Sequence, residues 1–552
     1  MNLAPETTPS RQIVIVGGVA AGMSAAARLR RLDGAAQITV VERSGNISFA
    51  NCGLPYHVGG VIEQRDALLL QTPQAIKARF DIDVHVRTEA VRINRDEHTV
   101  TVRQLDTGAE RDLPYTALVL APGATPVRPP LPGIERALGL RNVEDTDAMV
   151  AAISGAKTAV VVGGGFIGVE VAENLVHKGL QVALVEATAQ VMAPLDPEMV
   201  APVHDVLRQA GVDLRLGQSV KAIGESDVEL SDGTRLPADV VVASIGVKPE
   251  SGLAREAGLE LGERGGIVVD EQFRTSDPDI FAVGDAVHKV DAVDGSPTLV
   301  PLAQTANLQG RRVADVIAGR PVGDRPVLGT AIVGIFGLQV ASTGWNEKRL
   351  VAAGRRHRII HTHPVQHAGY YPGAEQMALK LLVDPETDAI LGAQGVGRDG
   401  VDKRIDVIAT AMSAGLTASQ LAELELAYAP QFGSAKDPVN MLGFVAENLA
   451  TGLSQNIQWH ELQAAQEAGA TVLDVRTQGE YDAGNIPGAI LIPVDELRGR
   501  MDELPEGELV VHCAVGVRAH VAAQMLAEAG RRGVRNLDGG YKTWQAGMAS
   551  RA

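Results

Sequence analysis

The sequence predicts an α/β protein built from several domains. Two segments each run from a short apolar, β-branched stretch through a glycine-rich turn into a helix-like stretch, and then into a second apolar stretch that ends in an acidic residue. Near the C-terminus, a third segment again alternates strand-like and helix-like stretches. Such alternation is typical of parallel sheets covered by helices. With 552 residues, the chain is long enough for roughly three or four domains.

The composition excludes several classes of function. The 50 Lys and Arg residues and 67 Asp and Glu residues leave a net charge of −17, which argues against nucleic acid or an anionic membrane as the main partner. The only two cysteines, Cys52 and Cys513, exclude a disulfide scaffold and a CxxC zinc site. Residues 1–12 lack the apolar core of a signal peptide, so we expect a reducing, cytoplasmic location. The uncharged stretch Pro326–Asn346 contains four glycines and reads as buried strands, not as a membrane span.

The first of the two similar segments begins with the strand-like run Gln12–Val16. The turn Gly17–Gly22 follows, then a helix-like run at Met23–Leu32, a strand at Ile38–Val41, and Glu42. In a dinucleotide-binding unit the helix N-terminus faces a pyrophosphate, and an acid about 20 residues beyond the last glycine binds a ribose hydroxyl. Glu42 is 20 residues beyond Gly22, although Val19 stands where the fingerprint has its middle glycine.

The second segment carries the complete fingerprint. Strand Ala159–Val162 leads into the GxGxxG turn Gly163–Gly168, a helix-like run at Val169–Lys178, a strand at Gln181–Val185, and Glu186. Two such units predict two dinucleotides; the alternative is a duplicated domain that binds one ligand. Glu186, with no nearby arginine for a 2′-phosphate, favours NADH over NADPH.

Two further motifs indicate a family. Ala121–Gly123 and the run Thr275–Asp285 resemble the corresponding motifs of the two-dinucleotide flavoprotein disulfide reductases, and the resemblance covers about residues 11–447. It implies that the first glycine-rich turn binds FAD, that the second binds NAD(P)H, and that Asp285 binds the flavin ribitol. The implied FAD-binding residues are Gly17, Val19, Ala20, Ala21, Gly22, Glu42, Arg43, Ala121, Gly123, Gly284, Asp285 and Ala303. The implied nicotinamide-site residues are Gly163, Gly165, Phe166, Ile167, Gly168, Glu186 and Gly246.

The same resemblance implies a domain order. We expect an FAD domain at 1–122 and 247–325, a nicotinamide-nucleotide domain at 123–246, and an α+β dimerisation domain at 326–447. A linker at 448–456 and a C-terminal α/β domain at 457–552 follow. Because the family dimerises through its third domain, we expect a homodimer.

Cys52 lies in the run Ser48–Pro55 and has no second cysteine nearby. It therefore cannot form an internal disulfide, and Cys52 can only be a thiolate, a sulfenic acid, or a mixed disulfide or persulfide with a small molecule. The alternative is a buried structural cysteine. Gly53 and Pro55 suit a loop that turns into a helix start, where the helix dipole favours the thiolate.

The surroundings of Cys52 resemble the coenzyme A-disulfide reductase branch, which also contains single-cysteine NADH oxidases and peroxidases. The resemblance implies that CoA contacts Ser48, Asn51, Arg31 and Arg79. The runs Gly369–Gly373 and Tyr428–Pro430 resemble the motifs that bring tyrosines across the dimer to stabilise a departing thiolate. Tyr370 and Tyr428 are the expected catalytic tyrosines, with Tyr371 a near alternative; ordinary interface packing is the competing interpretation.

Four histidines, His357, His361, His363 and His367, cluster in the sequence. Arg356–His363 reads as a strand, and no cysteine or acid accompanies it, so we expect structural or surface histidines and no metal.

The C-terminal segment resembles a single rhodanese domain. Strand Leu509–His512 leads into the loop Cys513–Arg518, which has the form C-x4-R. Backbone N–H groups of such a loop and the following helix N-terminus favour a persulfide on Cys513, whereas the related phosphatases carry a loop one residue longer for a phosphate. Ala514 and Val515 replace the basic residues of many relatives, which disfavours thiosulfate as the donor. The alternative is a catalytically silent module.

Together these resemblances imply an NADH-dependent FAD enzyme that reduces CoA persulfide or polysulfide sulfur at Cys52 and releases hydrosulfide. Cys513, assisted by Arg518, would transfer sulfane sulfur. Three alternatives remain open: a CoA-disulfide reductase, an NADH oxidase or peroxidase that uses a sulfenic acid, and a redox-sensing or sulfur-carrier protein with negligible turnover.

Overall fold

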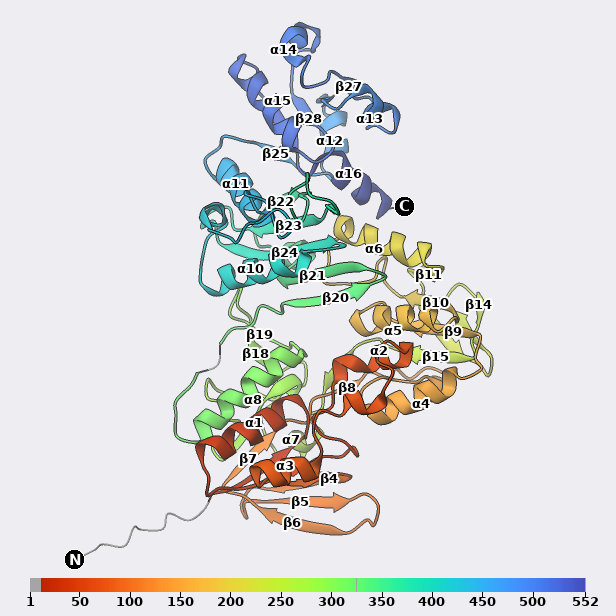
Figure 1. Ribbon diagram of the computed structural model, residues 1–552, viewed down its shortest axis with the longest axis vertical. Coiled ribbons are helices and arrows are strands. Elements are labelled where there is room, and N and C mark those ends of the chain that lie inside the picture. Colours follow the sequence, from red (N-terminus) through yellow and green to blue (C-terminus); the bar gives the residue numbers. More distant parts are fainter. Residues whose placement is uncertain (1–10, 324, 552) are drawn as a thin grey trace, which may run out of the picture. The chain divides into compact units, whose positions relative to one another are not determined.

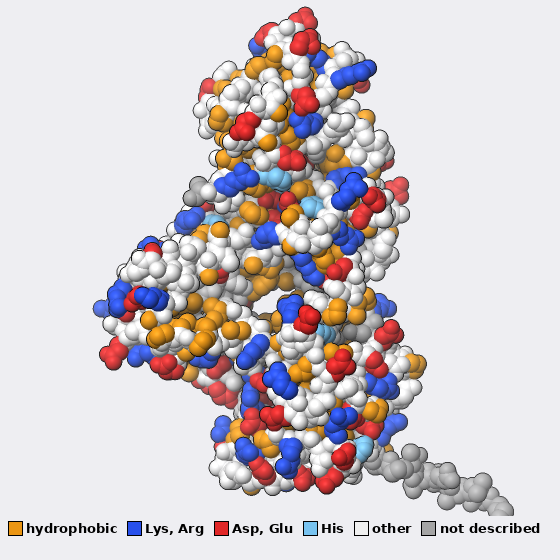
Figure 2. Space-filling view, turned by 180° about the vertical axis from the view of Figure 1, so that it is seen from behind, with side chains coloured by type: hydrophobic (Ala, Val, Ile, Leu, Met, Phe, Trp, Pro, Cys, Tyr) orange, Lys and Arg blue, Asp and Glu red, His pale blue; other side chains and the backbone are white. Residues whose placement is uncertain are grey.

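A computed structural model describes residues 11–323 and 325–551 (Figure 1). The chain divides into two compact units, one formed by residues 1–189 and 211–327 and the other by residues 190–210 and 328–552. Acidic and basic side chains are interspersed on the face that Figure 2 displays. Among the described residues, no helix combines the length and the apolar character that crossing a membrane requires.

The first unit is built around a five-stranded parallel sheet. Its strands, in the order β17-β7-β1-β2-β3, are Ile280–Ala282, Ala117–Leu120, Gln12–Val16, Gln37–Val41 and Asp83–His85. Strand β1 pairs with β2 on one side, Ile15 opposite Val40, and with β7 on the other, Ile15 opposite Val119. Strand β17 therefore joins a sheet whose other strands lie more than 150 residues earlier in the chain.

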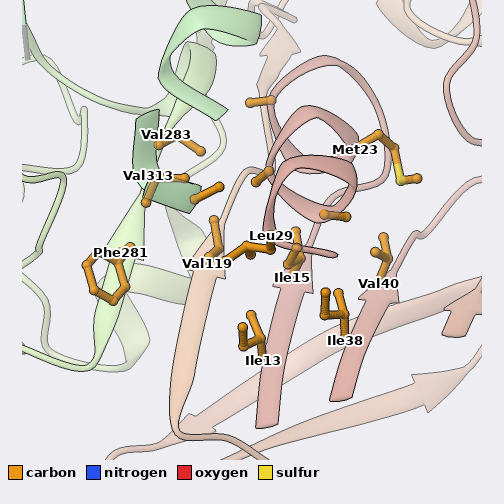
Figure 3. Packing of buried hydrophobic residues seen from close by; sticks show 14 of the residues in the cluster. Ile13, Ile15, Met23, Leu29, Ile38, Val40, Val119, Phe281, Val283 and Val313 are labelled. Carbon is orange, nitrogen blue, oxygen red and sulfur yellow. The ribbon is translucent and has the colours of Figure 1, made fainter. Parts of the chain in front are cut away.

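The two faces of this sheet are covered differently. Ile13 and Ile15 of β1 face helices α1 (Ala20–Leu32), α3 (Pro73–Phe80) and α8 (Ala303–Ile317), and Figure 3 shows this packing around Leu29 and Val313. Val14 and Val16 point to the opposite face, because successive side chains of a strand alternate. That face is covered by α7 (Gly252–Glu256) and the antiparallel sheet β4 (Thr88–Asn94), β5 (Thr99–Gln104) and β6 (Glu110–Pro114).

A second parallel sheet in the same unit has the order β11-β10-β9-β15. Its strands are Asp213–Leu216, Gln181–Glu186, Thr158–Val162 and Val240–Ala243. Helix α5 (Phe166–His177) contacts this sheet and also α2 (Leu54–Gly59), which in turn contacts α4 (Val143–Ile153). The antiparallel strands β12 (Val220–Ile223), β13 (Asp227–Leu230) and β14 (Arg235–Pro237) share an apolar core with the sheet. The chain passes between the two parallel sheets along a paired ribbon, β8 (Ala124–Pro126) and β16 (Val247–Pro249).

The second unit contains a five-stranded antiparallel sheet in the order β20-β21-β24-β23-β22. The strands are Ala331–Ile335, Leu338–Gly344, Ile390–Gly397, Ala378–Val383 and Arg358–Thr362. Helices α10 (Val401–Ser413) and α11 (Pro438–Ala450) form its apolar core. The uncharged stretch Pro326–Asn346 is thus two strands, as predicted.

Helix α6 (Pro197–Gln209) belongs to this second unit, although the predicted nicotinamide-nucleotide domain at 123–246 would include it. The physical reason is polar: the backbone N–H of Asp196 donates to Gln394 of β24 at 2.8 Å, and Lys380 of β23 donates to Glu198 of α6 at 2.5 Å. Buried charged groups persist only when they are paired, so these contacts tie α6 to the antiparallel sheet.

The C-terminal part of the second unit has a parallel sheet in the order β25-β29-β28-β26-β27. Its strands are Asn456–Ile457, Val534–Leu537, Leu509–His512, Thr471–Asp474 and Ile490–Leu491. The helices around it are α12 (Leu462–Glu467), α13 (Gln478–Asp482), α14 (Leu497–Arg500), α15 (Val517–Glu528) and α16 (Gly540–Ala549). The expected linker at 448–456 begins inside α11 and ends in β25, so its ends are regular structure.

Candidate functional site

A cavity of about 690 Å³ opens at the carboxyl ends of the first parallel sheet. Open α/β sheets bind their ligands at this edge, outside the carboxyl ends of the strands. Residues that the sequence analysis assigned to FAD line the cavity: Gly17, Val19, Ala20, Ala21, Glu42, Arg43, Ala121, Gly123, Gly284 and Asp285. Asn51, assigned to CoA, also lines it.

Close packing explains why the first turn needs glycine at both ends. Gly17 has a φ of +105°, and a Cβ there would lie 2.1 Å from the carbonyl oxygen of Ala121. A Cβ on Gly22 would lie 1.9 Å from the carbonyl oxygen of Gly17. Gly22 itself does not line the cavity. Its contribution to the site is indirect, because the missing side chain allows helix α1 to approach strand β1 closely.

Glu42 is held in place by the backbone. Its carboxylate accepts hydrogen bonds from the N–H groups of Gly18 at 2.7 Å and Ser44 at 2.8 Å. The acid at the end of β2 is therefore positioned in the cavity wall by the glycine-rich turn itself.

The donor set fits FAD. Asp285 Oδ1 is buried and makes no hydrogen bond with a described residue, and burial raises the pKa of Asp285. A buried carboxylate oxygen that faces a cavity without a partner requires a donor from a ligand, such as a ribitol hydroxyl. The N-terminus of α1 at the turn suits a pyrophosphate.

Sequence reasoning missed one cation, and one residue that it assigned to FAD is not among those that line the cavity. Arg141 lines the cavity and donates to the carbonyl oxygen of Pro122 at 3.2 Å, while burial lowers the pKa of Arg141. No local motif marks Arg141, because it reaches the cavity from the segment before α4. Ala303, assigned to FAD, is the first residue of α8; Ala306, one turn further, lines the cavity in its place.

The second glycine-rich turn repeats the same construction. Gly163 has a φ of +102°, and a Cβ on Gly168 would lie 1.9 Å from the carbonyl oxygen of Gly163. Glu186 accepts hydrogen bonds from the backbone N–H of Gly164 and from the N–H and hydroxyl of Thr188, each at 2.8 Å. Helix α5 begins at Phe166, and Ile167 is its second residue. Gly246 follows β15 and has a φ of +102°. The hydroxyl of Ser244, on the same connection, is buried and makes no hydrogen bond with a described residue.

Cys52 is exposed and lies in a single 3₁₀ turn, Asn51–Gly53, that leads into α2. Ser48 has a φ of +46°, and its N–H donates to the carbonyl oxygen of Gly18 at 2.9 Å. The cysteine loop is thus anchored directly on the first glycine-rich turn. Its loop-to-helix setting is as predicted.

The pKa of Cys52 does not follow the helix-dipole expectation. Partial burial of the thiol, together with the carboxylates Glu170 and Asp285, raises the pKa of Cys52. Glu170 of α5 also accepts a hydrogen bond from the Tyr56 hydroxyl at 2.9 Å. Burial, which disfavours the charged thiolate, is the largest of these causes, and the two carboxylates add to it.

The two arginines assigned to CoA lie on neighbouring helix ends. Arg31 is in the last turn of α1 and Arg79 in the last turn of α3, and both are exposed. Arg30 connects these helix ends, because its guanidinium donates to the carbonyl oxygens of Phe80 at 2.7 Å and Asp81 at 2.9 Å.

The predicted tyrosines form a pair on the second unit. The hydroxyls of Tyr370 and Tyr428 lie 2.8 Å apart, and this hydrogen bond raises the pKa of Tyr370. Tyr370 is 76% exposed and Phe432 is 68% exposed. Tyr371 instead packs its ring edge-on against His367, with 5.5 Å between ring centroids, which separates it from the hydroxyl pair.

The clustered histidines have protein partners. His361 contacts Asp538 and Glu198, the Nε2 of His363 lies 2.7 Å from the Thr543 hydroxyl, and His357 and His367 contact backbone carbonyls. One group of three acids with metal-like spacing occurs among the described residues, Asp196, Glu198 and Glu347. The ammonium of Lys380 lies 2.5–3.0 Å from all three, so the protein itself supplies a cation to this group.

The C-x4-R loop curls around Cys513. The N–H of Gly516 donates to the Cys513 sulfur at 3.2 Å, and α15 begins at the next residue. The loop is closed from outside by the N–H groups of Tyr541 and Lys542, which donate to the carbonyl oxygens of Cys513 at 2.8 Å and Ala514 at 3.0 Å. Arg518 pairs with Glu480. The cysteine is buried among apolar residues.

Comparison with known protein families matches three segments of the chain. Residues 11–310 match the pyridine nucleotide-disulphide oxidoreductase family, residues 330–438 its dimerisation domain, and residues 458–547 the rhodanese-like domain.

Individual proteins are similar over most or all of the chain. The reduced CoADR-RHD of Bacillus anthracis superposes with a TM-score of 0.96 at 46% identity, over 99% of both chains. An NAD-dependent persulfide reductase from A. fulgidus superposes with a TM-score of 0.91 at 40% identity, over 97% of this chain and 100% of that one. A coenzyme A disulfide reductase from Staphylococcus haemolyticus is 35% identical over 450 residues, 80% of this chain and all of that protein.

Proposed function

Because the chain belongs to the pyridine nucleotide-disulphide oxidoreductase family and ends in a rhodanese-like domain, we propose that it is an NADH-dependent persulfide reductase. Its substrate is the sulfane sulfur of CoA persulfide or a polysulfide. The observation that carries this proposal is the lone Cys52, exposed in a loop anchored on the FAD turn, in one chain with a persulfide-type loop at Cys513.

The residues of this chain have separate roles in the proposed reaction. FAD, when bound, supplies two-electron transfer between NADH and sulfur. Cys52 attacks the sulfane sulfur, takes it as a persulfide and releases the carrier thiol; two electrons and protons then free hydrosulfide and restore the thiol. Tyr370 and Tyr428 stabilise the developing thiolate as a pair: one phenol O–H donates to the sulfur, and the other donates to its partner's oxygen and orients it. CoA, which carries the sulfane sulfur, binds to Arg31, Arg79, Ser48 and Asn51.

The rhodanese half transfers sulfur through Cys513. The N–H of Gly516 at the sulfur supports a persulfide, which carries negative charge on its outer sulfur. We propose that this half loads or shuttles sulfane sulfur, while the Cys52 site removes it reductively.

The test is anaerobic NADH oxidation by the purified protein with CoA persulfide, CoA disulfide and hydrogen peroxide as separate acceptors. We expect CoA persulfide to give the highest kcat/KM, Cys52→Ser to abolish the activity, and Cys513→Ser to spare it. Cys513→Ser should lose sulfur transfer from a donor. Full persulfide reduction by Cys52→Ser would refute the proposal.

A CoA-disulfide reductase is the second candidate, because relatives of that name are 35% identical over the first 80% of the chain. It predicts a higher kcat/KM for CoA disulfide than for CoA persulfide. Fast turnover with peroxide and no sulfur acceptor would instead indicate a peroxidase that uses a Cys52 sulfenic acid. A protein that consumes NADH slowly with every acceptor would be a sensor or carrier.

A further inference from the structure

The arginine of the rhodanese loop is already paired. Both terminal nitrogens of Arg518 donate to the carboxylate of Glu480, at 2.8 and 2.5 Å, and each side chain is about one third exposed. Two parallel bonds between a guanidinium and a carboxylate fix both orientations. The arginine of the C-x4-R loop therefore has its charge matched by a neighbouring acid.

Glu480 is held in this position from its own helix. The N–H and the hydroxyl of Thr477 both donate to Glu480 at 3.0 Å, and the two residues form a capping box at the start of α13. Hydrogen bonds from Arg518, and then from Thr477, lower the pKa of Glu480 to about 2, so the carboxylate is charged at neutral pH. The pairing is thus a fixed part of the loop's surroundings.

The rest of the loop adds no positive charge. Its residues between Cys513 and Arg518 are Ala, Val, Gly and Val. Arg476, just after β26, is bound to Asp474 at 2.6 Å, and burial lowers the pKa of His512 in β28 to about 4, so that this imidazole is neutral. The Lys542 ammonium is directed to Gln376.

We propose that Glu480 is a specificity-determining residue of the rhodanese site, which excludes dianionic sulfur donors and selects thiol persulfides. The inference rests on sulfur transfer through Cys513 and deepens it. The Cys513 thiolate attacks the outer sulfur of a donor R–S–S⁻, the donor's S–S bond breaks, and the thiolate R–S⁻ leaves with the electron pair. With thiosulfate the same step expels sulfite, and the dianion must approach a loop whose arginine already has its charge matched by Glu480.

The test compares two Glu→Gln variants of the full-length holoenzyme. Glu480→Gln removes the negative charge but keeps an amide that can complete the capping box. Glu461→Gln is the matched control, because Glu461 likewise accepts from a backbone N–H three residues earlier, that of Gln458 at 2.8 Å, without an arginine partner among the described residues. Thiocyanate formation from cyanide is measured with thiosulfate and with cysteine persulfide as donors.

We expect Glu480→Gln to raise the ratio of kcat/KM for thiosulfate over kcat/KM for cysteine persulfide by about 10-fold or more, since a like charge at close range costs an anion this much. The gain should come from a lower KM for thiosulfate. Glu461→Gln should leave the ratio at its wild-type value.

A binding measurement separates this inference from the proposed function. Sulfate should slow the alkylation of Cys513 by iodoacetamide in Glu480→Gln and not in the wild type, whether or not sulfur is transferred. An unchanged donor ratio, or equal loss with both donors, would overturn the role of Glu480. Failure of wild-type Cys513 to accept sulfur from every donor would count against the proposed function, and the sulfate experiment would still decide the role of Glu480.

Discussion

Cys52 and the acids near it set the chemistry of the reductase site at the scale of single residues. Burial and the carboxylates of Glu170 and Asp285 hold the pKa of Cys52 above its usual value. A thiol with a raised pKa stays protonated near neutrality and is protected from random oxidation, but it needs a base or a change of charge before it can attack.

This environment makes a pH-dependent prediction. Glu170→Gln removes the negative charge that is the largest influence on the Cys52 pKa after burial, so the pKa should fall and the pH profile of Cys52 alkylation by iodoacetamide should move to lower pH. The rate rises with pH through the pKa because only the thiolate reacts. Glu173→Gln is the control on the same helix, since Glu173 raises the pKa of Tyr56 and of Glu170, whereas the carboxylates that raise the pKa of Cys52 are Glu170 and Asp285. Equal profiles for wild type and Glu170→Gln would contradict the prediction.

At the scale of elements, one buried histidine joins three segments of the second unit. The Nδ1 of His361 in β22 lies 2.7 Å from Asp538, which precedes α16, and its Nε2 lies 3.0 Å from Glu198 in α6. Asp538 also accepts from Asn456 at 3.0 Å. The rhodanese sheet, the antiparallel sheet and α6 therefore meet at a single imidazole that is buried with both acids.

The charge of His361 links this junction to pH. Burial alone would lower the pKa of His361, but the hydrogen bonds that its ring donates to Asp538 and Glu198 outweigh burial and raise the pKa to about 9. The folded value lies above the usual 6.5, so the stabilisation is complete below about pH 6.5 and is lost as the pH rises through 9.

We predict that the free energy of unfolding of the second unit falls by about 3 kcal/mol between pH 6.5 and pH 10, at about 1.4 kcal/mol per unit of pKa shift. His361→Gln should lose about 3–5 kcal/mol at pH 6.5, because it leaves buried acids without their cation, and should show little of this pH dependence. Urea unfolding followed by tryptophan fluorescence measures it, since Trp345, Trp459 and Trp544, the only tryptophans, all lie in the second unit.

His363→Gln provides the matched control. Burial lowers the pKa of His363 to about 3, so its imidazole is neutral, and the Nε2 of this ring lies 2.7 Å from the Thr543 hydroxyl. Its loss should cost less and leave the pH dependence intact. A His361→Gln protein with the wild-type pH dependence would contradict the assignment of the transition to His361.

At the scale of the whole molecule, the exposed aromatic residues Tyr370, Tyr428 and Phe432 lie on the unit that carries the dimerisation domain. Large exposed aromatic side chains that cluster on one surface are typical of an interface. We therefore expect a homodimer in which the tyrosine pair of one protomer serves Cys52 of the other.

Complementation between inactive protomers tests this arrangement. A heterodimer of Cys52→Ser with Tyr370→Phe/Tyr428→Phe should have one complete site, and thus about half the activity of the wild-type dimer, because each C2-related site takes one part from each protomer. Each homodimeric variant should be nearly inactive. The heterodimer is purified through two tags. If it remains as inactive as its parents, the tyrosines act within their own protomer. A protein that sediments as a monomer and keeps full activity would show that no dimer is required.

The sequence by itself determined the strands, glycine-rich turns and terminal acids of both dinucleotide units. These features are local: apolar period, glycine spacing and the distance to Glu42 or Glu186 follow from neighbouring residues, and the structure has them within a few positions. The two unpaired cysteines and the C-x4-R loop could also be predicted from the sequence. The first depends only on the number of cysteines, and the second only on the spacing between Cys513 and Arg518.

Only the tertiary structure decided which distant charges meet. These partners are tens to hundreds of residues apart in the sequence. They are Arg141 in the FAD cavity, Glu170 near Cys52, Glu480 on Arg518, and Glu198 and Asp538 on His361. An acidic side chain on a helix looks the same in the sequence whether it faces solvent or a buried cation. Its effect on a pKa depends on distance and burial, which folding alone fixes.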